Sequence, residues 1–293
     1  MKTDGRRQSD NIEDRRGQSA GRGRFPGGKI GAGGGLGLII VVVLALLFGV
    51  DPRQLIDQLA VQQNENTGTE QSQAPYQPTP EEAERRKLIA VVLAETEDTW
   101  TSIFKANGKV YQEPTLVLFS REVASACGHA QSAAGPFYCP GDQKLFLDLS
   151  FFDDMSTKLG ANGDFAMAYV VAHEVAHHVQ TLLGVTGDVN AKRQRASDEE
   201  ANSLSVKLEL QADCLAGIWA NHAQKQQILE PGDIDEALNA AAAVGDDRLQ
   251  RRSQGHVVPE SFTHGTSAAR VAWFTKGLQA GEVNQCNTFK GGI

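Results

Sequence analysis

The sequence has little excess positive charge, few cysteines and no repeated unit. It carries 28 Lys and Arg residues against 36 Asp and Glu residues, a formal net charge of −8. Eight of the basic and four of the acidic residues lie within residues 1–29, so residues 30–293 have a net charge of −12. Because the phosphates of nucleic acids repel an acidic surface, we expect no nucleic-acid partner. The lack of self-similarity at a fixed period excludes solenoid folds.

Charged residues and proline are absent from residues 30–50, which are mostly apolar. As a helix this stretch would be about 30 Å long, which matches the hydrocarbon core of a bilayer. It follows a basic segment, whereas residues 51–84 contain a single basic residue, Arg53. The positive-inside rule therefore predicts a single-pass membrane protein with a cytoplasmic N-terminus and an extracytoplasmic body, either periplasmic or at the cell surface.

Two other interpretations of residues 30–50 are a cleaved signal peptide and a buried core helix. No small-residue cleavage site follows Val50, the apolar run is long for a signal peptide, and its many glycines would weaken a helix in water. The spacing of Gly31/Gly35 and Gly33/Gly37 allows two membrane helices to approach closely. A homodimer through this segment is therefore a further prediction.

The regions on either side of this segment differ in composition. Residues 1–29 are predicted to be a basic cytoplasmic tail, and residues 51–79 a linker, because the latter are rich in Gln, Asn, Thr and Pro. Order is expected to resume at Thr79, which can cap a helix that begins with Pro80. Residues 80–293 are therefore predicted to form one domain.

Within this domain, two short apolar runs at 115–119 and 144–149 predict strands, separated by Gly/Pro turns. A helical pattern runs from residue 80 to about 107. After residue 150 the sequence is helical almost throughout, with helices expected at 150–160, 164–183, 197–226, 233–244 and 267–278. The predicted fold class is α+β, mostly helical, with a small β-sheet.

The four cysteines are Cys127, Cys139, Cys214 and Cys286, and none has the CxxC spacing of a cysteine-ligated zinc site. In an extracytoplasmic domain they can form disulfides. Cys127 and Cys139 flank the turn between the predicted strands and are expected to pair, which leaves Cys214 to pair with Cys286. The alternative is that Cys214 is a buried free thiol in an apolar helix.

Residues 169–180 contain a His-Glu-x-x-His motif formed by His173, Glu174 and His177. Histidines four residues apart lie about 40° apart on one helix face, so both can reach one metal ion. Glu174 projects about 100° away, where it can contact a water next to the metal. The flanking residues are apolar, and a carboxylate in such a helix is costly unless it is compensated. The spacing predicts a zinc site with Glu174 as general base.

Two histidines leave zinc one protein ligand short. Glu209 and Asp213 lie four residues apart on the longest predicted helix. Glu209 is the candidate third ligand, and Asp213 can accept a hydrogen bond from the far nitrogen of a ligand histidine. The alternative is a solvated acidic stripe, but apolar neighbours surround Asp213 in the sequence.

These motifs resemble those of the gluzincin metallopeptidases, and more closely those of the bacterial neutral zinc metallopeptidase family (YpfJ-like). The resemblance runs over most of residues 80–290. It includes FYCPGDQKLFLDLSFF (137–152), AHEVAHHVQ (172–180), ELQADCLAG (209–217) and ESFTHGTSAARVAWF (260–274). It implies a zincin-like domain, one Zn²⁺ per chain and a membrane anchor.

Thr263 and His264, followed by Arg270, also resemble a His…Arg element of membrane gluzincins that lies near the substrate. Here Gly265 takes the place of the usual proline. The resemblance makes His264 and Arg270 candidate catalytic residues.

The predicted function is that of a membrane-anchored zinc endopeptidase, in which a zinc-activated water attacks a peptide or protein substrate and Glu174 takes the proton. The strand at 144–150 is the candidate edge for an extended substrate. The alternatives are a catalytically inactive zincin-like adaptor and a structural zinc protein at the membrane. A structural site needs a fourth ligand, and His178 points about 100° away from His177.

Overall fold

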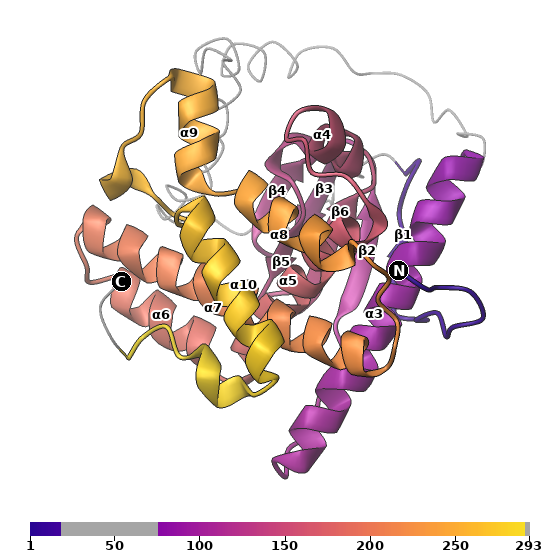
Figure 1. Ribbon diagram of the computed structural model, residues 1–293. Coiled ribbons are helices and arrows are strands. Elements are labelled where there is room, and N and C mark those ends of the chain that lie inside the picture. The colour runs from indigo at the N-terminus through magenta and orange to yellow at the C-terminus, as the bar shows by residue number, and fades with distance from the viewer. Residues whose placement is uncertain (19–75, 291–293) are drawn as a thin grey trace, which may run out of the picture.

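The computed structural model describes residues 1–18 and 76–290 (Figure 1). The predicted membrane span at 30–50 and most of the predicted linker at 51–79 lie outside these residues. Within the described ranges, no helix is both long and apolar enough to cross a bilayer.

A small mixed sheet forms one layer of the fold. Its strand order is β1 (Ile12–Asp14), β2 (Thr115–Phe119), β6 (Lys144–Asp148) and β5 (Phe137–Cys139). The first three strands are parallel, with Leu116 opposite both Ile12 and Leu145, and β5 runs antiparallel to β6. The strands predicted at 115–119 and 144–149 are confirmed as β2 and β6. A separate hairpin is formed by β3 (Glu122–Ser125) and β4 (Gly128–Gln131).

The pairing corrects one prediction about this sheet. The strand KLFLDLS was expected to be a free edge for an extended substrate, but β6 is hydrogen-bonded to β2 on one side and to β5 on the other. The antiparallel strand β5 is the edge on this side of the described sheet.

Helices make up most of the domain, so the mostly helical α+β class is confirmed. The prediction missed α6 and α9. The helices of the described ranges are α3 (Pro80–Ala106), α4 (Phe151–Thr157), α5 (Asp164–Leu182), α6 (Val185–Arg193), α7 (Asp198–Lys225), α8 (Asp233–Ala243), α9 (Asp246–Gln254) and α10 (Ser267–Ala280), with short 3₁₀ turns at Ser132–Ala134, Pro259–Ser261 and Val283–Cys286.

Local sequence explains where the two longest helices begin. Thr79 caps α3 and Ser197 caps α7, and in each case a glutamate three residues on, Glu82 or Glu200, bonds back to the cap. Each capping box satisfies backbone N–H groups that would otherwise lack partners.

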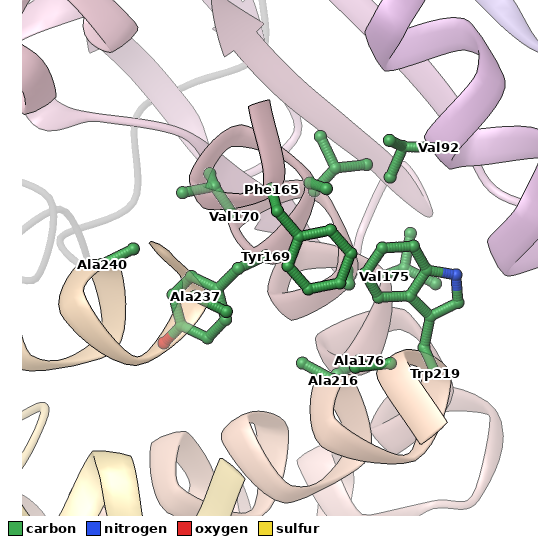
Figure 2. Close-up of a cluster of buried hydrophobic side chains, with 14 of the residues drawn as sticks. Val92, Phe165, Tyr169, Val170, Val175, Ala176, Ala216, Trp219, Ala237 and Ala240 are labelled. Atoms are coloured by element: carbon green, nitrogen blue, oxygen red, sulfur yellow. The ribbon is translucent and has the colours of Figure 1, made fainter. Parts of the chain in front are cut away.

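The core is built around α5, which is apolar on almost every face and must therefore be enclosed. Helices α3, α7 and α8 pack around it. Phe165 of α5 stacks on Trp219 of α7 with ring centroids 5.5 Å apart (Figure 2). Each large apolar side chain buried in this way contributes about 1.5–3 kcal/mol. The tight packing fixes α5, which carries the histidine motif, in the centre of the domain.

Helices α7 and α10 approach each other closely because each has a glycine at the contact. A Cβ atom on Gly217 would lie 2.1 Å from the carbonyl oxygen of Phe274, and one on Gly277 would lie 1.8 Å from that of Cys214. No larger side chain fits at either position without moving a backbone. This approach brings the C-terminal half of α10 against the C-terminal half of α7.

Both predicted disulfides are confirmed. Cys127 pairs with Cys139 and Cys214 pairs with Cys286, with Cα–Cα distances of 5.8 and 5.5 Å. The first links the β3–β4 hairpin to the edge strand β5. The second ties the Val283–Cys286 turn to α7, one residue beyond Asp213.

Residues 1–18 pack against the domain, whereas the prediction treated them as part of a separate cytoplasmic tail. Strand β1 extends the sheet beside β2, and Arg6 and Arg7 pair with Glu95 and Glu97 of α3, each at 2.8 Å. Figure 1 shows this segment lying along α3. A tail separated from the body by a membrane could not make these contacts, so residues 1–18 belong to the folded domain.

Candidate metal centre

Helix α5 presents the two motif histidines from one face. His173 is buried and His177 is partly buried, and their rings lie edge to face with centroids 4.8 Å apart. Glu174 is partly exposed, and its carboxylate forms no hydrogen bond or ion pair with any residue that the structure describes. The helix therefore places two imidazoles and one free carboxylate at the same site.

Helix α7 brings Glu209 to these histidines. The Oε2 atom of Glu209 lies 3.0 Å from Nε2 of His173, and its Oε1 atom lies 3.4 Å from Nε2 of His177. Zinc bonds of about 2.0–2.1 Å in a tetrahedral site give donor separations of about 3.3 Å. The two distances from Glu209 are near this value, and one donor atom from each of the three side chains lies within 4.8 Å of the other two.

Asp213 lies one turn beyond Glu209 and holds the other side of His173. Its Oδ1 atom is 3.0 Å from Nδ1 of His173 and accepts a 2.5 Å hydrogen bond from the Tyr169 hydroxyl. This leaves Nε2 of His173 directed at Glu209, which is the orientation that a metal ligand needs.

Arg270 lies behind the histidines and does not face solvent. Its guanidinium donates to both oxygens of Asp213, at 2.8 and 2.9 Å, and its Nη2 atom lies 3.8 Å from Glu209. The side chain is 3% exposed. The sequence led us to expect Arg270 near the substrate, but the structure shows that it holds Asp213 beneath the ligands.

Charge and burial shift the ionisation of the whole cluster. Burial alone would lower the pKa of His173, but the hydrogen bond and charge of Asp213, together with Glu209, raise that pKa to about 9. Burial opposes ionisation of Glu209 and Asp213 as well. His177 and His173 nevertheless hold the pKa of Glu209 well below its usual range, and Arg270 and His173 lower that of Asp213. Burial raises the pKa of Glu174. The charges of Asp213 and Glu209 therefore favour the cationic form of His173.

His264 lies in the loop before α10 and is oriented by Asp246. Its Nδ1 atom is 3.2 Å from Oδ1 of Asp246, whose Oδ2 accepts the backbone N–H groups of Thr263, His264 and Gly265. Burial opposes protonation of His264, but Asp246 and the charge of Glu209 raise its pKa. The side chain remains 49% exposed, so Nε2 is free to meet a ligand from solvent.

Sequence reasoning missed three supporting residues. Tyr169 donates to Asp213, and the Oε1 atom of Gln180 accepts a hydrogen bond from Nδ1 of His177 at 2.8 Å. Both lie on α5 one turn from a ligand, so helical spacing could have indicated them. Asp246 lies far from His264 in sequence, and no local signal connects the two.

His178, which the sequence argument rejected as a ligand, is engaged elsewhere. Its Nδ1 contacts the hydroxyl of Tyr138 at 3.0 Å, and its Nε2 contacts the carbonyl of Gln112 at 2.6 Å. These contacts tie α5 to the edge strand β5, immediately beside the ligand His177.

The comparison with protein families agrees with this geometry. The model of the family described as "Putative neutral zinc metallopeptidase" matches residues 1–289. The chain belongs to this family. The resemblance drawn from the motifs is confirmed, and the match extends to the first residue of the chain.

Relatives in this family cover most of the chain. "Uncharacterized protein YpfJ" of Escherichia coli strain K12 is 51% identical over 295 residues, with 99% of each chain covered. "Uncharacterized protein Rv2575" of Mycobacterium tuberculosis strain H37Rv is 41% identical over 258 residues, which cover 84% of this chain and 85% of that protein. No solved structure gives a significant match.

Proposed function

We propose that this protein is a zinc-dependent endopeptidase whose metal ligands are His173, His177 and Glu209. The observation that carries the proposal is the convergence of three donor atoms, all within 4.8 Å of one another, at helix α5, which also carries the free carboxylate of Glu174. The charges also fit, because the carboxylates of Glu174, Glu209 and Asp213 balance a divalent cation together with Arg270. Family membership supports zinc as the metal.

Glu174 acts as the general base. When bound, zinc would lower the pKa of a water and polarise the substrate carbonyl. Glu174 accepts a proton from the attacking water and passes it to the leaving amine. Its raised pKa makes the carboxylate a stronger base toward the attacking water, and the proton then passes to the leaving amine, which is more basic still.

His264 stabilises the negative charge that develops on the carbonyl oxygen. Asp246 fixes Nδ1 of the ring, so that the exposed Nε2 atom can donate a hydrogen bond toward the site. Arg270 acts through Asp213 and positions His173, so it is a positioning residue in this mechanism.

The substrate is a peptide in an extended conformation that pairs with strand β5. This strand bonds to β6 on one side, and no strand of the described residues pairs with its other edge. Tyr138 of β5 contacts His178, which is adjacent to His177, so a peptide along this edge would pass close to the metal ligands.

The location follows from the disulfides. Two disulfides are typical of an oxidising, extracytoplasmic compartment. We propose that the metal-centre domain lies in that compartment.

A structural zinc site is less compatible with the geometry. Such a site is closed by four protein ligands. Among the described residues, only His173, His177 and Glu209 converge at this point. The open fourth position is the arrangement of a catalytic site.

The proposal is tested by metal analysis and cleavage of a peptide library with the full chain. We expect about one zinc per chain, with zinc and cleavage both lost in His173→Ala and Glu209→Ala and both retained in the surface control Glu199→Gln. Unchanged zinc content in His173→Ala and Glu209→Ala would overturn the assignment of the ligands.

A further inference from the structure

The surface formed by α3 and the open side of β2 is covered by the first residues of the chain. Backbone bonds run from Leu116 N to the carbonyl of Asn11, from Arg15 N to that of Leu118, and from Ser9 N to that of Ala90, at 2.8–2.9 Å. These bonds link residues 9–15 to both a strand and a helix of the domain. The contact is therefore that of a strand built into the fold.

The acidic residues of α3 that face this segment depend on it. Glu97 is 1% exposed, and its two oxygens accept hydrogen bonds from Ser9 at 2.5 Å, Asn11 at 2.9 Å and Arg7 at 2.8 Å. Each of these donors lies within residues 1–18. If the segment were removed, a carboxylate in the core would lose the partners that allow it to remain charged there.

The basic residues of the segment are occupied by these and similar pairs. Arg6 pairs with Glu95, Arg7 with Glu97, Arg15 with Glu13 and Arg16 with Asp14. The positive-inside rule counts basic residues that remain hydrated on the cytoplasmic side. Four of the eight basic residues within 1–29 are instead paired with carboxylates of the same folded body. Their presence therefore does not indicate a cytoplasmic tail.

The two described ranges also meet where they end. The guanidinium of Arg16 lies 5.0 Å from the ring centroid of Tyr76, and a Cβ atom on Gly17 would lie 2.5 Å from Cβ of Tyr76. Arg16 and Gly17, near the end of the first described range, thus lie beside Tyr76, the first residue of the second.

We infer that residues 1–18 form an integral strand segment of the peptidase domain, on the same side of any membrane as the metal centre. A single crossing between residues 18 and 76 would separate β1 from β2 and Arg7 from Glu97, so the docked fold and a single span exclude each other. Residues 18 and 76, at which the two described ranges end, therefore lie on one side of any membrane.

A zero-length cross-link tests whether the contact exists in membranes from cells that express the full chain. The Nζ atom of Lys144 lies 2.5 Å from Oε1 of Glu13. A water-soluble carbodiimide should therefore join the two side chains by an amide bond, and the carbodiimide is itself hydrated to a urea by the water that this condensation releases. We expect a cross-linked peptide that joins Lys144 to Glu13 in the wild-type protein. The variant Lys144→Arg keeps the positive charge but has no amine to couple, so the cross-linked peptide should be absent. The Lys158–Asp154 pair at 2.9 Å, between α4 and the residue that caps its C-terminus, is the internal control.

Thiol labelling tests directly whether residues 1–18 and the rest of the domain lie on the same side of the membrane. All four native cysteines are in disulfides, so Gln8→Cys and Lys109→Cys each introduce one exposed thiol, the first in the docked segment and the second in the body. In intact spheroplasts, an impermeant maleimide should label both variants or neither. The inference would be overturned if only one of the two reacted, or if the Lys144–Glu13 link failed to form while the Lys158–Asp154 link did.

Discussion

The substitution Asp213→Asn removes the charge that joins Arg270 to the metal ligands. Asp213 is fully buried and binds Arg270 through both oxygens, Tyr169 at 2.5 Å and His173 at 3.0 Å. An amide keeps one acceptor but leaves the guanidinium of Arg270 buried with only Glu209, 3.8 Å away, as a nearby anion. Breaking one side of a buried pair typically costs about 3–5 kcal/mol, and loss of a residue that orients a ligand typically weakens metal binding about 10–100-fold.

A double-mutant cycle measures the interaction energy between Asp213 and Arg270 separately from their interactions with other residues. We expect Asp213→Asn/Arg270→Met to cost less than the sum of the two single changes, because no unpaired charge remains, with a coupling of about 1–3 kcal/mol. Urea unfolding gives the free energies, and competition with a fluorescent chelator gives the zinc affinity. Asp235→Asn, on the exposed side of α8, is the matched control. If Asp213→Asn behaved like this control in both assays, the role assigned to the Asp213–Arg270 pair would be wrong.

Three further outcomes follow from the same geometry. Because the pKa of His173 is raised to about 9 in the metal-free protein, zinc must displace a proton from His173 below that pH. Chelator competition should therefore show the zinc affinity falling about tenfold for each unit by which the pH is lowered, and an affinity that is constant from pH 6 to 9 would contradict the raised pKa. Gly217→Ala should destabilise the domain by about 1–3 kcal/mol because the added Cβ atom would meet the Phe274 carbonyl. The control Gly187→Ala, whose Cβ atom would point into open space, should not destabilise it, and equal melting temperatures for the two variants would refute the close approach of α7 and α10. Removing the Cys214–Cys286 disulfide, which closes a loop of 72 residues, should lower the free energy of unfolding by about 4 kcal/mol, against about 3 kcal/mol for Cys127–Cys139, which closes 12. Only the first removal should also weaken zinc binding, because Cys214 adjoins Asp213, and the reverse order of the two losses in urea unfolding would contradict this account.

Local signals in the sequence were sufficient for the parts of the fold that depend on neighbouring residues. The N-cap at Thr79, the apolar runs of β2 and β6 and the helix that carries the histidine motif all lie where they were predicted. Their stabilising interactions span only a few residues, so a short window contains the information.

Features that depend on distant packing could not be predicted in this way. The three residues of β1 lie in a charged segment, and only their pairing with β2 shows that they are a strand. The position of Arg270 depends on the close approach of α7 and α10 at Gly217 and Gly277. The order of strands in the sheet determines that β5, and not β6, has the open edge. This order depends on which strands pair with each other, so the sequence of a single strand does not reveal it.

The most direct test of the central claim is the rate of peptide cleavage by Glu174→Gln at measured zinc content. This change keeps the shape of the side chain and all three ligands but removes the general base. We expect about one zinc per chain, as in wild type, and cleavage slower by about 100-fold or more. Cleavage at the wild-type rate by the zinc-loaded variant would contradict the proposed mechanism.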